Sequence, residues 1–318
     1  MKRHRRWLYL GLLLVLLAAS AAVFMANPPL RTRGFFAFFR AWHAHWPLAA
    51  GQKLPERLLP AFRPFVPIWV EVAPGVTMWL DPHDVVTGYI LAYGNWEPWT
   101  TRELMRHTPP GGTFVDVGAH VGWYSLNAAR AVGPKGRVIA VEPDHGTLPK
   151  LRENIRASRA GAVVMVAPVA CADSESTLTF YSADPRNTGE SSLSADNASQ
   201  DGAIAASYPV RARRLDDILR EAGVGRVHAI KIDVEGAEFL VLKGAVETLD
   251  RYRPVVAVEI VDRQLKSMGS SESELRAFMH AHGYRAVHAY EQNTIFVPDP
   301  KAIPAPDRDA TGPGLAAR

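Results

Sequence analysis

One stretch, from Thr113 to Ser125, constrains the fold of this chain more than any other. It begins with Thr-Phe-Val-Asp-Val, whose apolar and β-branched residues are typical of a buried parallel strand. Gly118 and Gly122 then permit a sharp turn, and the residues from Ser125 onward open a helix. A strand, a glycine turn and a helix N-terminus in this order form a cradle for a nucleotide.

Strands and helices alternate along the rest of the chain. Further buried strands are predicted at 136–142, 162–169, 228–233 and 254–260. Helices are predicted at 125–131, 147–157, 215–222, 239–248 and 272–282, and a final antiparallel pair at 285–290 and 294–297. This alternation predicts an α/β fold: a doubly wound, mostly parallel, seven-stranded Rossmann-like sheet with an antiparallel C-terminal strand pair.

Four further features lie outside this alternation. A hairpin is predicted at 68–72 and 76–80, and Pro98 suits the first position of a helix. The alternating residues 176–181 suggest an antiparallel insertion. Residues 182–208 are rich in Ser, Asp, Asn and Gly and predict a long loop, which in a compact domain is usually functional or mobile.

Three of the predicted parallel strands end in an acid: Asp116, Glu142 and Asp233. Ligands of such sheets bind beyond the carboxyl ends of the strands. Asp116 occupies the first glycine position of the dinucleotide fingerprint G-x-G-x-x-G, where a carboxylate would repel a pyrophosphate and suits a cationic ligand. Glu142 is placed to accept both ribose hydroxyls of an adenosine, although an acid at a strand end is also a common helix N-cap. S-adenosylmethionine, which carries an ammonium and a sulfonium but no phosphate, fits both acids.

Several motifs resemble those of a known family. Residues 113–154 look like the S-adenosylmethionine-binding core of class I methyltransferases. Ile230-Lys-Ile-Asp-Val-Glu-Gly-Ala-Glu238, followed by Leu242-Lys-Gly-Ala245, is similar to the signature of the FkbM methyltransferase family. Tyr93-Gly-Asn-Trp-Glu97 and Arg253-Pro-Val-Val-Ala-Val-Glu259 also fit that family in order and spacing. The resemblance implies a methyltransferase that acts on hydroxyls of sugars, lipids or polyketides.

The resemblance also implies roles for individual residues. It assigns cofactor binding to Asp116, Gly118 and Glu142. Glu97, His120 and Gly122 are further candidates for cofactor binding. The family usually has asparagine at position 120, and we expect the imidazole of His120 to hydrogen-bond the glycine turn instead. Asp233 and Glu235 are implied to face the transferred methyl group, where a base increases the rate by roughly 10²–10⁴.

Lys231 alternates onto the same strand face as Asp233 and is a further catalytic candidate. The alternative is a structural Lys231–Asp233 ion pair, because a lysine in a central strand must be paired. No metal site is predicted, since the histidines show no metal-ligand spacing, although Asp233 and Glu259 could approach each other at neighbouring strand ends. Cys171, the single cysteine, has apolar neighbours and is predicted to be a buried structural thiol.

The N-terminal residues predict a membrane anchor. Trp7–Ala26 contains no charge and is long enough, as a helix, to span ~30 Å of hydrocarbon. A cleavable signal peptide is the alternative, but Phe24 and Met25 do not suit a cleavage site. We therefore expect residues 1–27 to form a basic flank and an uncleaved transmembrane helix.

The remaining boundaries follow from composition. Residues 28–67 are basic, aromatic and Pro-rich; their segment Gly34–Trp46 is predicted to be a helix that lies at the membrane surface or packs on the domain. The methyltransferase domain is expected at 68–297, and a disordered tail at 298–318. Ten Lys/Arg and one Glu give residues 1–63 a charge of +9, which leaves −5 for the remainder of a chain of net charge +4. This asymmetry favours a membrane over a nucleic acid as partner.

The sequence thus predicts a methyltransferase whose domain faces the cytoplasm, where its cofactor is made, and whose acceptor is a small-molecule or lipid-linked hydroxyl. Its membrane anchor is either a single span or a shallow hairpin that Trp7–Ala26 forms with Gly34–Trp46. Two alternatives remain open. A Rossmann-type oxidoreductase that depends on a nucleotide sugar or on NAD is disfavoured by the missing first glycine and by the segment Asp233-Val-Glu-Gly-Ala-Glu238. A non-catalytic anchored binding module is disfavoured by the intact acids. The sequence makes no prediction of oligomeric state.

Overall fold

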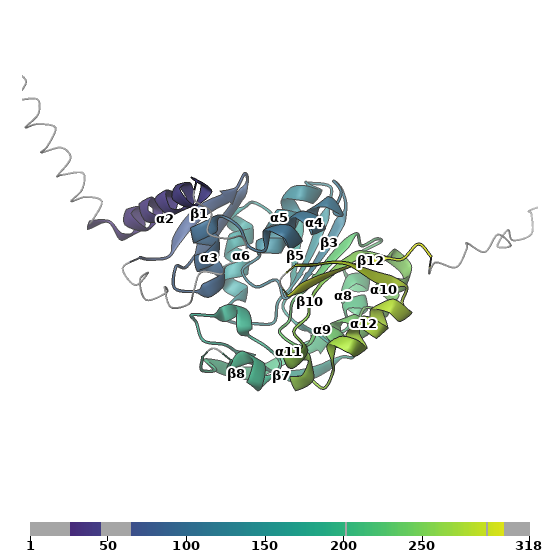
Figure 1. The fold of residues 1–318 in the computed structure, drawn as a ribbon. Coiled ribbons are helices and arrows are strands. Elements are labelled where there is room, and N and C mark those ends of the chain that lie inside the picture. The colour runs from purple at the N-terminus through teal and green to yellow at the C-terminus, as the bar shows by residue number, and fades with distance from the viewer. Residues whose placement is uncertain (1–25, 46–64, 201, 291, 302–318) are drawn as a thin grey trace, which may run out of the picture.

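The computed structural model describes residues 26–45, 65–200, 202–290 and 292–301 (Figure 1). The predicted anchor Trp7–Ala26 lies outside these residues except for Ala26, and so do residues 302–318 of the predicted tail. Within the described ranges, no helix combines the length and the apolar character that crossing a membrane requires.

A seven-stranded sheet forms the centre of the fold, as predicted. Its strands in spatial order are β11 (Tyr284–Tyr290), β12 (Asn293–Pro298), β10 (Val255–Glu259), β9 (Ala229–Ile232), β3 (Thr113–Val117), β4 (Arg137–Val141) and β5 (Val164–Ala167). Neighbours from β10 to β5 pair in parallel, whereas β12 pairs antiparallel with both β10 and β11. The chain moves outward from β3 through β4 to β5 and returns to the other side at β9. The order therefore reverses between β3 and β9, which is where a ligand site is expected.

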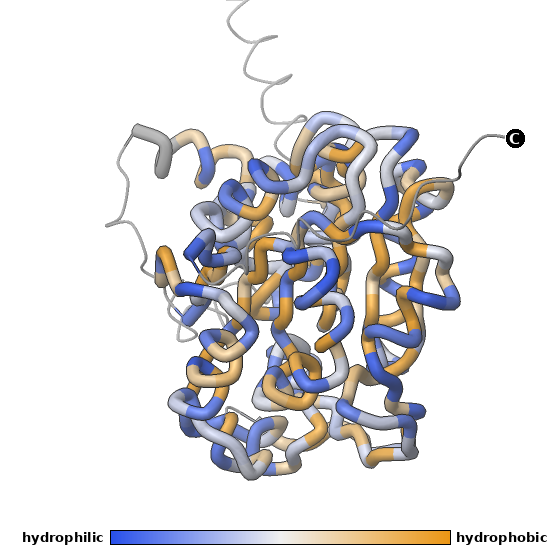
Figure 2. Tube along the Cα trace, turned by 90° about the vertical axis from the view of Figure 1, so that its right-hand side faces the viewer, coloured by the Kyte–Doolittle hydropathy of each residue, from blue (hydrophilic) through white to orange (hydrophobic). Residues whose placement is uncertain are grey.

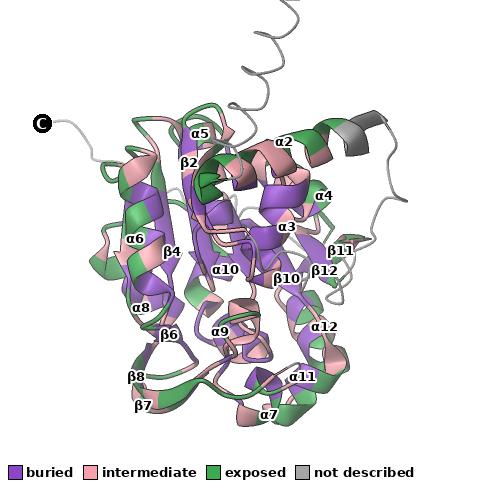
Figure 3. Ribbon diagram, turned by 90° about the vertical axis from the view of Figure 1, so that its left-hand side faces the viewer, coloured by how far each residue is buried: buried purple, intermediate pink, exposed green. Residues whose placement is uncertain are grey.

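Helices cover both faces of this sheet (Figure 1). One face carries α3 (Val85–Tyr93), α4 (Pro98–Arg106), α5 (Trp123–Val132) and α6 (Leu148–Ala157). The other carries α8 (Leu215–Glu221), α9 (Glu238–Lys243), α10 (Val246–Tyr252), α11 (Asp262–Ser267) and α12 (Glu272–Ala281). The strands separate two cores because successive side chains point to opposite faces: Phe114 packs in the first core and Val115 in the second. Figure 3 shows the buried strands between these layers, and Figure 2 shows the apolar segments that run through the interior.

The chain before β3 adds a hairpin and a helix to the first core. β1 (Ile68–Ala73) and β2 (Val76–Leu80) form the predicted antiparallel hairpin. Helix α2 (Pro28–His45) packs against α3 and β1, and Phe36 on α2 is 1% exposed within the first core. Arg40 donates a hydrogen bond to the Leu91 carbonyl oxygen at 2.8 Å. Packing on the domain, one of the two alternatives predicted for this segment, is thus what the structure shows, and the folded domain begins before residue 68.

A small three-stranded sheet, β6–β8–β7, extends the domain beyond β5. It contains β6 (Ala170–Cys171), β7 (Ser176–Ser182) and β8 (Ala206–Arg213), so the predicted antiparallel insertion is confirmed. The predicted long loop 182–208 holds two short helices, η2 (Thr188–Glu190) and α7 (Ala195–Ala198). This loop lies beside the carboxyl ends of the central strands.

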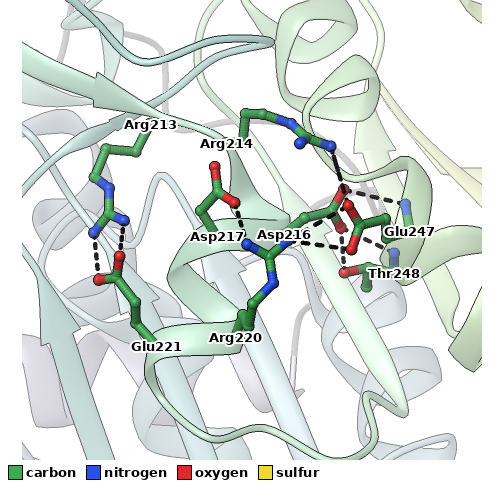
Figure 4. Close-up of polar contacts among 8 residues, drawn as sticks. All are labelled: Arg213, Arg214, Asp216, Asp217, Arg220, Glu221, Glu247 and Thr248. Carbon is green, nitrogen blue, oxygen red and sulfur yellow. Dashed lines mark hydrogen bonds and ion pairs between the residues drawn. The ribbon is translucent and has the colours of Figure 1, made fainter.

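The predicted helix at 239–248 is wrong in one respect, because it is two helices, α9 and α10. They meet at Gly244, where a Cβ would lie 2.1 Å from the Ala172 carbonyl oxygen. The start of α10 is held by Asp216 of α8 (Figure 4). The Asp216 carboxylate accepts hydrogen bonds from the backbone N–H groups of Glu247 (3.1 Å) and Thr248 (2.9 Å) and from the Thr248 hydroxyl (2.7 Å). A side chain distant in sequence therefore caps this helix.

Candidate active site

A cleft of about 290 Å³ opens at the carboxyl ends of β3, β4, β9 and β10. Six of the predicted site residues line it: Glu97, Gly118, His120, Glu142, Asp233 and Glu235. The other three, Asp116, Gly122 and Lys231, are not among the lining residues. Segments far apart in the sequence thus converge where the strand order reverses, between β3 and β9.

The glycine turn is required by close contacts on both of its sides. Gly118 has a φ of +83°, and a Cβ there would lie 1.7 Å from the Asp233 carbonyl oxygen. Gly122 has a φ of +97°, and its Cβ would lie 2.8 Å from Leu151 of α6. At Gly118 the backbone contact leaves no room for any side chain, whereas at Gly122 a side chain would be strained by the positive φ and would have to displace the Leu151 side chain. The turn therefore lies directly against the end of β9, which carries the predicted catalytic acid.

Asp116 lies beneath this turn and is 1% exposed. Its Oδ2 accepts a hydrogen bond from the Ser125 hydroxyl at 2.6 Å, and its Oδ1 has no partner among the described residues. Burial raises the pKa of Asp116 to about 6, although Ser125 and Lys231 act in the opposite direction. A buried, incompletely paired carboxylate beneath the turn disfavours an anion above it and suits a cationic ligand.

Glu142 holds the turn through both of its carboxylate oxygens. Oε2 accepts a hydrogen bond from the backbone N–H of His120 at 2.7 Å, and Oε1 accepts one from Asp144 at 2.8 Å. Each oxygen keeps a second lone pair for a ligand hydroxyl. The capping alternative is excluded because the N-cap of α6 is Thr147. Burial raises the pKa of Glu142 to about 8, while the bond from Asp144 acts to lower it.

His120 corrects one expectation. Its imidazole does not bond the glycine turn; Nε2 lies 2.7 Å from the Thr188 hydroxyl, which donates to Asp84 at 2.7 Å. His120 has a φ of +49°, and its contribution to the turn is the hydrogen bond that its backbone N–H donates to Glu142. Burial lowers the pKa of His120. His120 thus links the glycine turn to Thr188 in the loop 182–208, and Thr188 in turn contacts Asp84, the N-cap of α3.

Lys231 and Asp233 form an ion pair, with 2.9 Å between Nζ and Oδ2. Lys231 is fully buried, and its Nζ is also 4.0 Å from Glu97. Burial, the largest single effect, raises the pKa of Asp233, but the Lys231 ammonium and a hydrogen bond with Glu259 together outweigh it, so the pKa lies below its ordinary value. Burial likewise lowers the pKa of Lys231, and the neighbouring carboxylates more than reverse this effect. Both groups are therefore ionised in the fold.

Glu235 is held rigidly at the rim of the cleft. Its φ is +53°, and its carbonyl oxygen accepts hydrogen bonds from the Ser192 hydroxyl (2.7 Å) and the Asn197 amide (2.8 Å). Its carboxylate accepts a further bond from Gln264. Burial, followed by the charge of Asp233, raises the pKa of Glu235 well above its ordinary value. Glu235 is thus a positioned carboxyl group with enhanced basicity.

Glu97 and Glu238 are occupied by different partners. Glu97 accepts hydrogen bonds from the Tyr124 hydroxyl at 2.5 Å and the Asn293 amide at 2.8 Å. Glu238 accepts bonds from the backbone N–H groups of the turn that precedes it, so it stabilises that turn. Thr188, Ser192, Asn197 and Gln264 were not predicted individually. The only sequence signal for the first three was the polar loop that contains them.

The charge of the lining is one-sided. The described lining residues include no lysine or arginine. They include seven residues with a carboxyl group: Glu97, Glu142, Asp144, Glu190, Asp233, Glu235 and Glu259. Together with the glycine turn and the free lone pairs of Glu142, this lining fits an adenosine that carries positive charge. It does not fit a pyrophosphate, which would need cationic side chains or unobstructed helix dipoles.

Comparison with known proteins shows which family the chain resembles. The family description "Methyltransferase FkbM domain" matches residues 116–286. The chain is 29% identical to the AMB antimetabolite synthetase AmbE of Pseudomonas aeruginosa over 55% of this chain and 10% of that protein. It is 28% identical to the 31-O-demethyl-FK506 methyltransferase FkbM of Streptomyces tacrolimicus, over 63% and 83%. It is 27% identical to the hexuronic acid methyltransferase AglP of Haloferax volcanii, over 50% and 60%. The chain therefore spans about a tenth of the synthetase and three fifths of AglP.

Proposed function

The chain belongs to the FkbM methyltransferase family, and from this membership we propose that it methylates a hydroxyl oxygen on a sugar or another small hydroxylated acceptor. Its cofactor is S-adenosylmethionine. The observation that carries the proposal is the position of Glu235, a basic carboxyl group at the rim of a cleft whose other side holds the glycine turn and Glu142.

The residues of the cofactor side have separate tasks. Glu142 accepts the ribose hydroxyls with the lone pairs that His120 and Asp144 leave free. Gly118, which has no side chain, lets the glycine turn lie against the end of β9. The acidic lining of the cleft favours a ligand with positive charge. When bound, S-adenosylmethionine supplies an electrophilic methyl group, so that a C–O bond forms while the C–S bond breaks and its electron pair returns to sulfur.

Glu235 takes the proton of the acceptor hydroxyl. The raised pKa makes the ionised carboxylate a stronger base than an exposed one, and the ionised fraction increases as pH rises towards that pKa. Proximity to the acceptor adds to this effect. Asp233, held ionised by Lys231, orients the acceptor hydroxyl and disfavours negative charge elsewhere in the cleft. In this scheme Lys231 is a positioning residue because it contacts Asp233 and is absent from the lining.

The names of two relatives support oxygen as the acceptor atom. One is a 31-O-demethyl-FK506 methyltransferase, and another is a hexuronic acid methyltransferase, which places a sugar among the acceptors of similar proteins. We further propose that Trp7–Ala26 anchors the domain at the cytoplasmic face of a membrane, from its charge-free composition and the cytoplasmic origin of the cofactor. Protease added to intact cells should leave the domain uncut, and digestion there would contradict this topology.

The test is transfer of labelled methyl groups. The full chain in detergent is incubated with methyl-labelled S-adenosylmethionine and extract of its own cells, and the labelled product is identified by mass spectrometry. Glu235→Gln should reduce turnover by roughly 10²–10⁴ while cofactor affinity stays within about threefold. Label on nitrogen or carbon instead of oxygen would contradict O-methylation. Turnover of Glu235→Gln within about threefold of the parent would remove Glu235 from the proposed role.

A further inference from the structure

Three carboxylates from distant parts of the chain meet at one side of the cleft. Glu97 precedes α4, Asp233 follows β9 and Glu259 ends β10. Each offers an oxygen, and these oxygens all lie within 4.8 Å of one another. All three residues line the cleft, so the cluster is open to solutes on that side.

The cluster carries more negative charge than its one resident cation balances. The Lys231 ammonium contacts Asp233 at 2.9 Å and reaches Glu97 only at 4.0 Å. No ion pair joins it to Glu259 among the described residues. With three carboxylates and one ammonium, the group would have a charge of −2 when fully ionised.

Two buried oxygen atoms at the cluster have no hydrogen-bond partner among the described residues. One is Oε2 of Glu259, a residue that is 8% exposed. The other is Oδ1 of Asn293, a residue that is 1% exposed and pairs with Glu259 across β10 and β12. The Asn293 amide is fixed beside the cluster because its Nδ2 donates to Glu97. A buried acceptor without a partner is costly, so such an atom points to a bound group.

We propose that Glu97, Asp233 and Glu259 bind a divalent cation with a preference for oxygen ligands: Mg²⁺, Mn²⁺ or Ca²⁺. Carboxylate and amide oxygens are the ligands that these ions select, and the cluster contains no nitrogen or sulfur ligand that would favour zinc. A divalent ion would cancel the residual charge of −2. Among the described residues, Lys231 forms ion pairs with Glu97 and Asp233 but not with Glu259.

This assignment places the cation on the acceptor side of the cleft, with Asp233 as a shared residue. Its remaining coordination positions would face the cavity, where water or the oxygens of a polyhydroxylated acceptor can occupy them. That consequence rests on the proposed function, whereas binding of the cation does not. The competing arrangement has no metal and keeps Glu259 protonated, donating a hydrogen bond to Asp233.

Titration of Mn²⁺ into the metal-free full chain in detergent distinguishes the two arrangements. Electron paramagnetic resonance of free Mn²⁺ should show one saturable site per chain, and Mg²⁺ or Ca²⁺ should compete for it. Glu259→Gln should weaken Mn²⁺ binding at least tenfold. The matched control is Glu190→Gln, which removes an acid from the same cleft outside the cluster and should change the affinity less than twofold.

Three results would overturn the proposal. They are the absence of saturable Mn²⁺ binding to the parent chain, equal losses in the two variants, and unchanged affinity in Glu259→Gln. Thermal unfolding in chelator verifies that Glu259→Gln remains folded, and titration of the parent chain needs no variant. Binding of S-adenosylmethionine in chelator is measured in parallel. If S-adenosylmethionine binds but Mn²⁺ does not, the cation site alone is rejected. If Mn²⁺ binds but S-adenosylmethionine does not, the proposed function is rejected and the cation site stands.

Discussion

Glu142→Gln separates the two tasks assigned to Glu142. The side chain keeps its shape, but one oxygen becomes an NH₂ group, which then faces the backbone N–H of either His120 or Asp144. Two donors cannot bond each other, so one backbone N–H loses its acceptor and one lone pair for the ribose disappears. A hydrogen bond to a charged group contributes ~1.5–3 kcal/mol, and ~1.4 kcal/mol corresponds to a factor of ten in affinity. Cofactor affinity should therefore fall ~10- to 100-fold.

The orphaned backbone N–H affects stability separately. Leaving a buried donor unpaired costs ~1–3 kcal/mol, which should appear in the free energy of unfolding measured with urea. Calorimetric titration of the full chain with S-adenosylmethionine gives the affinity. Glu153→Gln, an exposed position on the neighbouring α6, is the matched control and should change neither quantity. Affinity of Glu142→Gln within threefold of the parent would refute the ribose assignment.

The same residue predicts a pH dependence. Burial raises the pKa of Glu142 to about 8 in the free protein, and the ribose hydroxyls donate to the ionised carboxylate. Binding therefore favours the deprotonated form: affinity should increase as pH rises towards 8 and level off above it. Glu142→Gln cannot titrate and should flatten this dependence. A parent affinity that falls between pH 6.5 and 8 would contradict the assignment.

Three further outcomes are expected. Asp216→Ala should lower the free energy of unfolding by ~1–3 kcal/mol for each buried donor that loses its acceptor at the start of α10. A total loss below ~1 kcal/mol in urea titration would contradict this. Cys171, whose pKa burial raises to about 12, should react with a thiol reagent only after unfolding, and rapid labelling of the native chain would contradict its burial. Gly118→Ala should abolish cofactor binding through its contact with Asp233, whereas Gly111→Ala, at a similar φ with open space around it, should retain binding; equal effects would show that φ alone matters.

The sequence predicted what depends on periodicity and on short spacing. The strands of the central sheet follow from apolar runs, and the Lys231–Asp233 pair follows from alternation along one strand. The contact between His120 and Thr188 joins residues 68 positions apart, and no repeating pattern encodes such a contact. The break at Gly244 has the same origin, because it depends on the Ala172 carbonyl oxygen. Sequence patterns locate the acids, and tertiary contacts decide their partners.

The buried position of Phe36 limits how far the enzyme can move from its proposed anchor. A flexible linker spans roughly 5–6 Å multiplied by the square root of its length in residues. Between Ala26, where the predicted span ends, and Pro28, where α2 begins, only Asn27 remains. Helix α2 packs on α3, and α3 supplies Val85 and Val86 to the cleft wall. If Trp7–Ala26 spans a bilayer as proposed, the cleft would stay at a nearly constant height above it, and the enzyme would reach only acceptors that diffuse to the membrane surface.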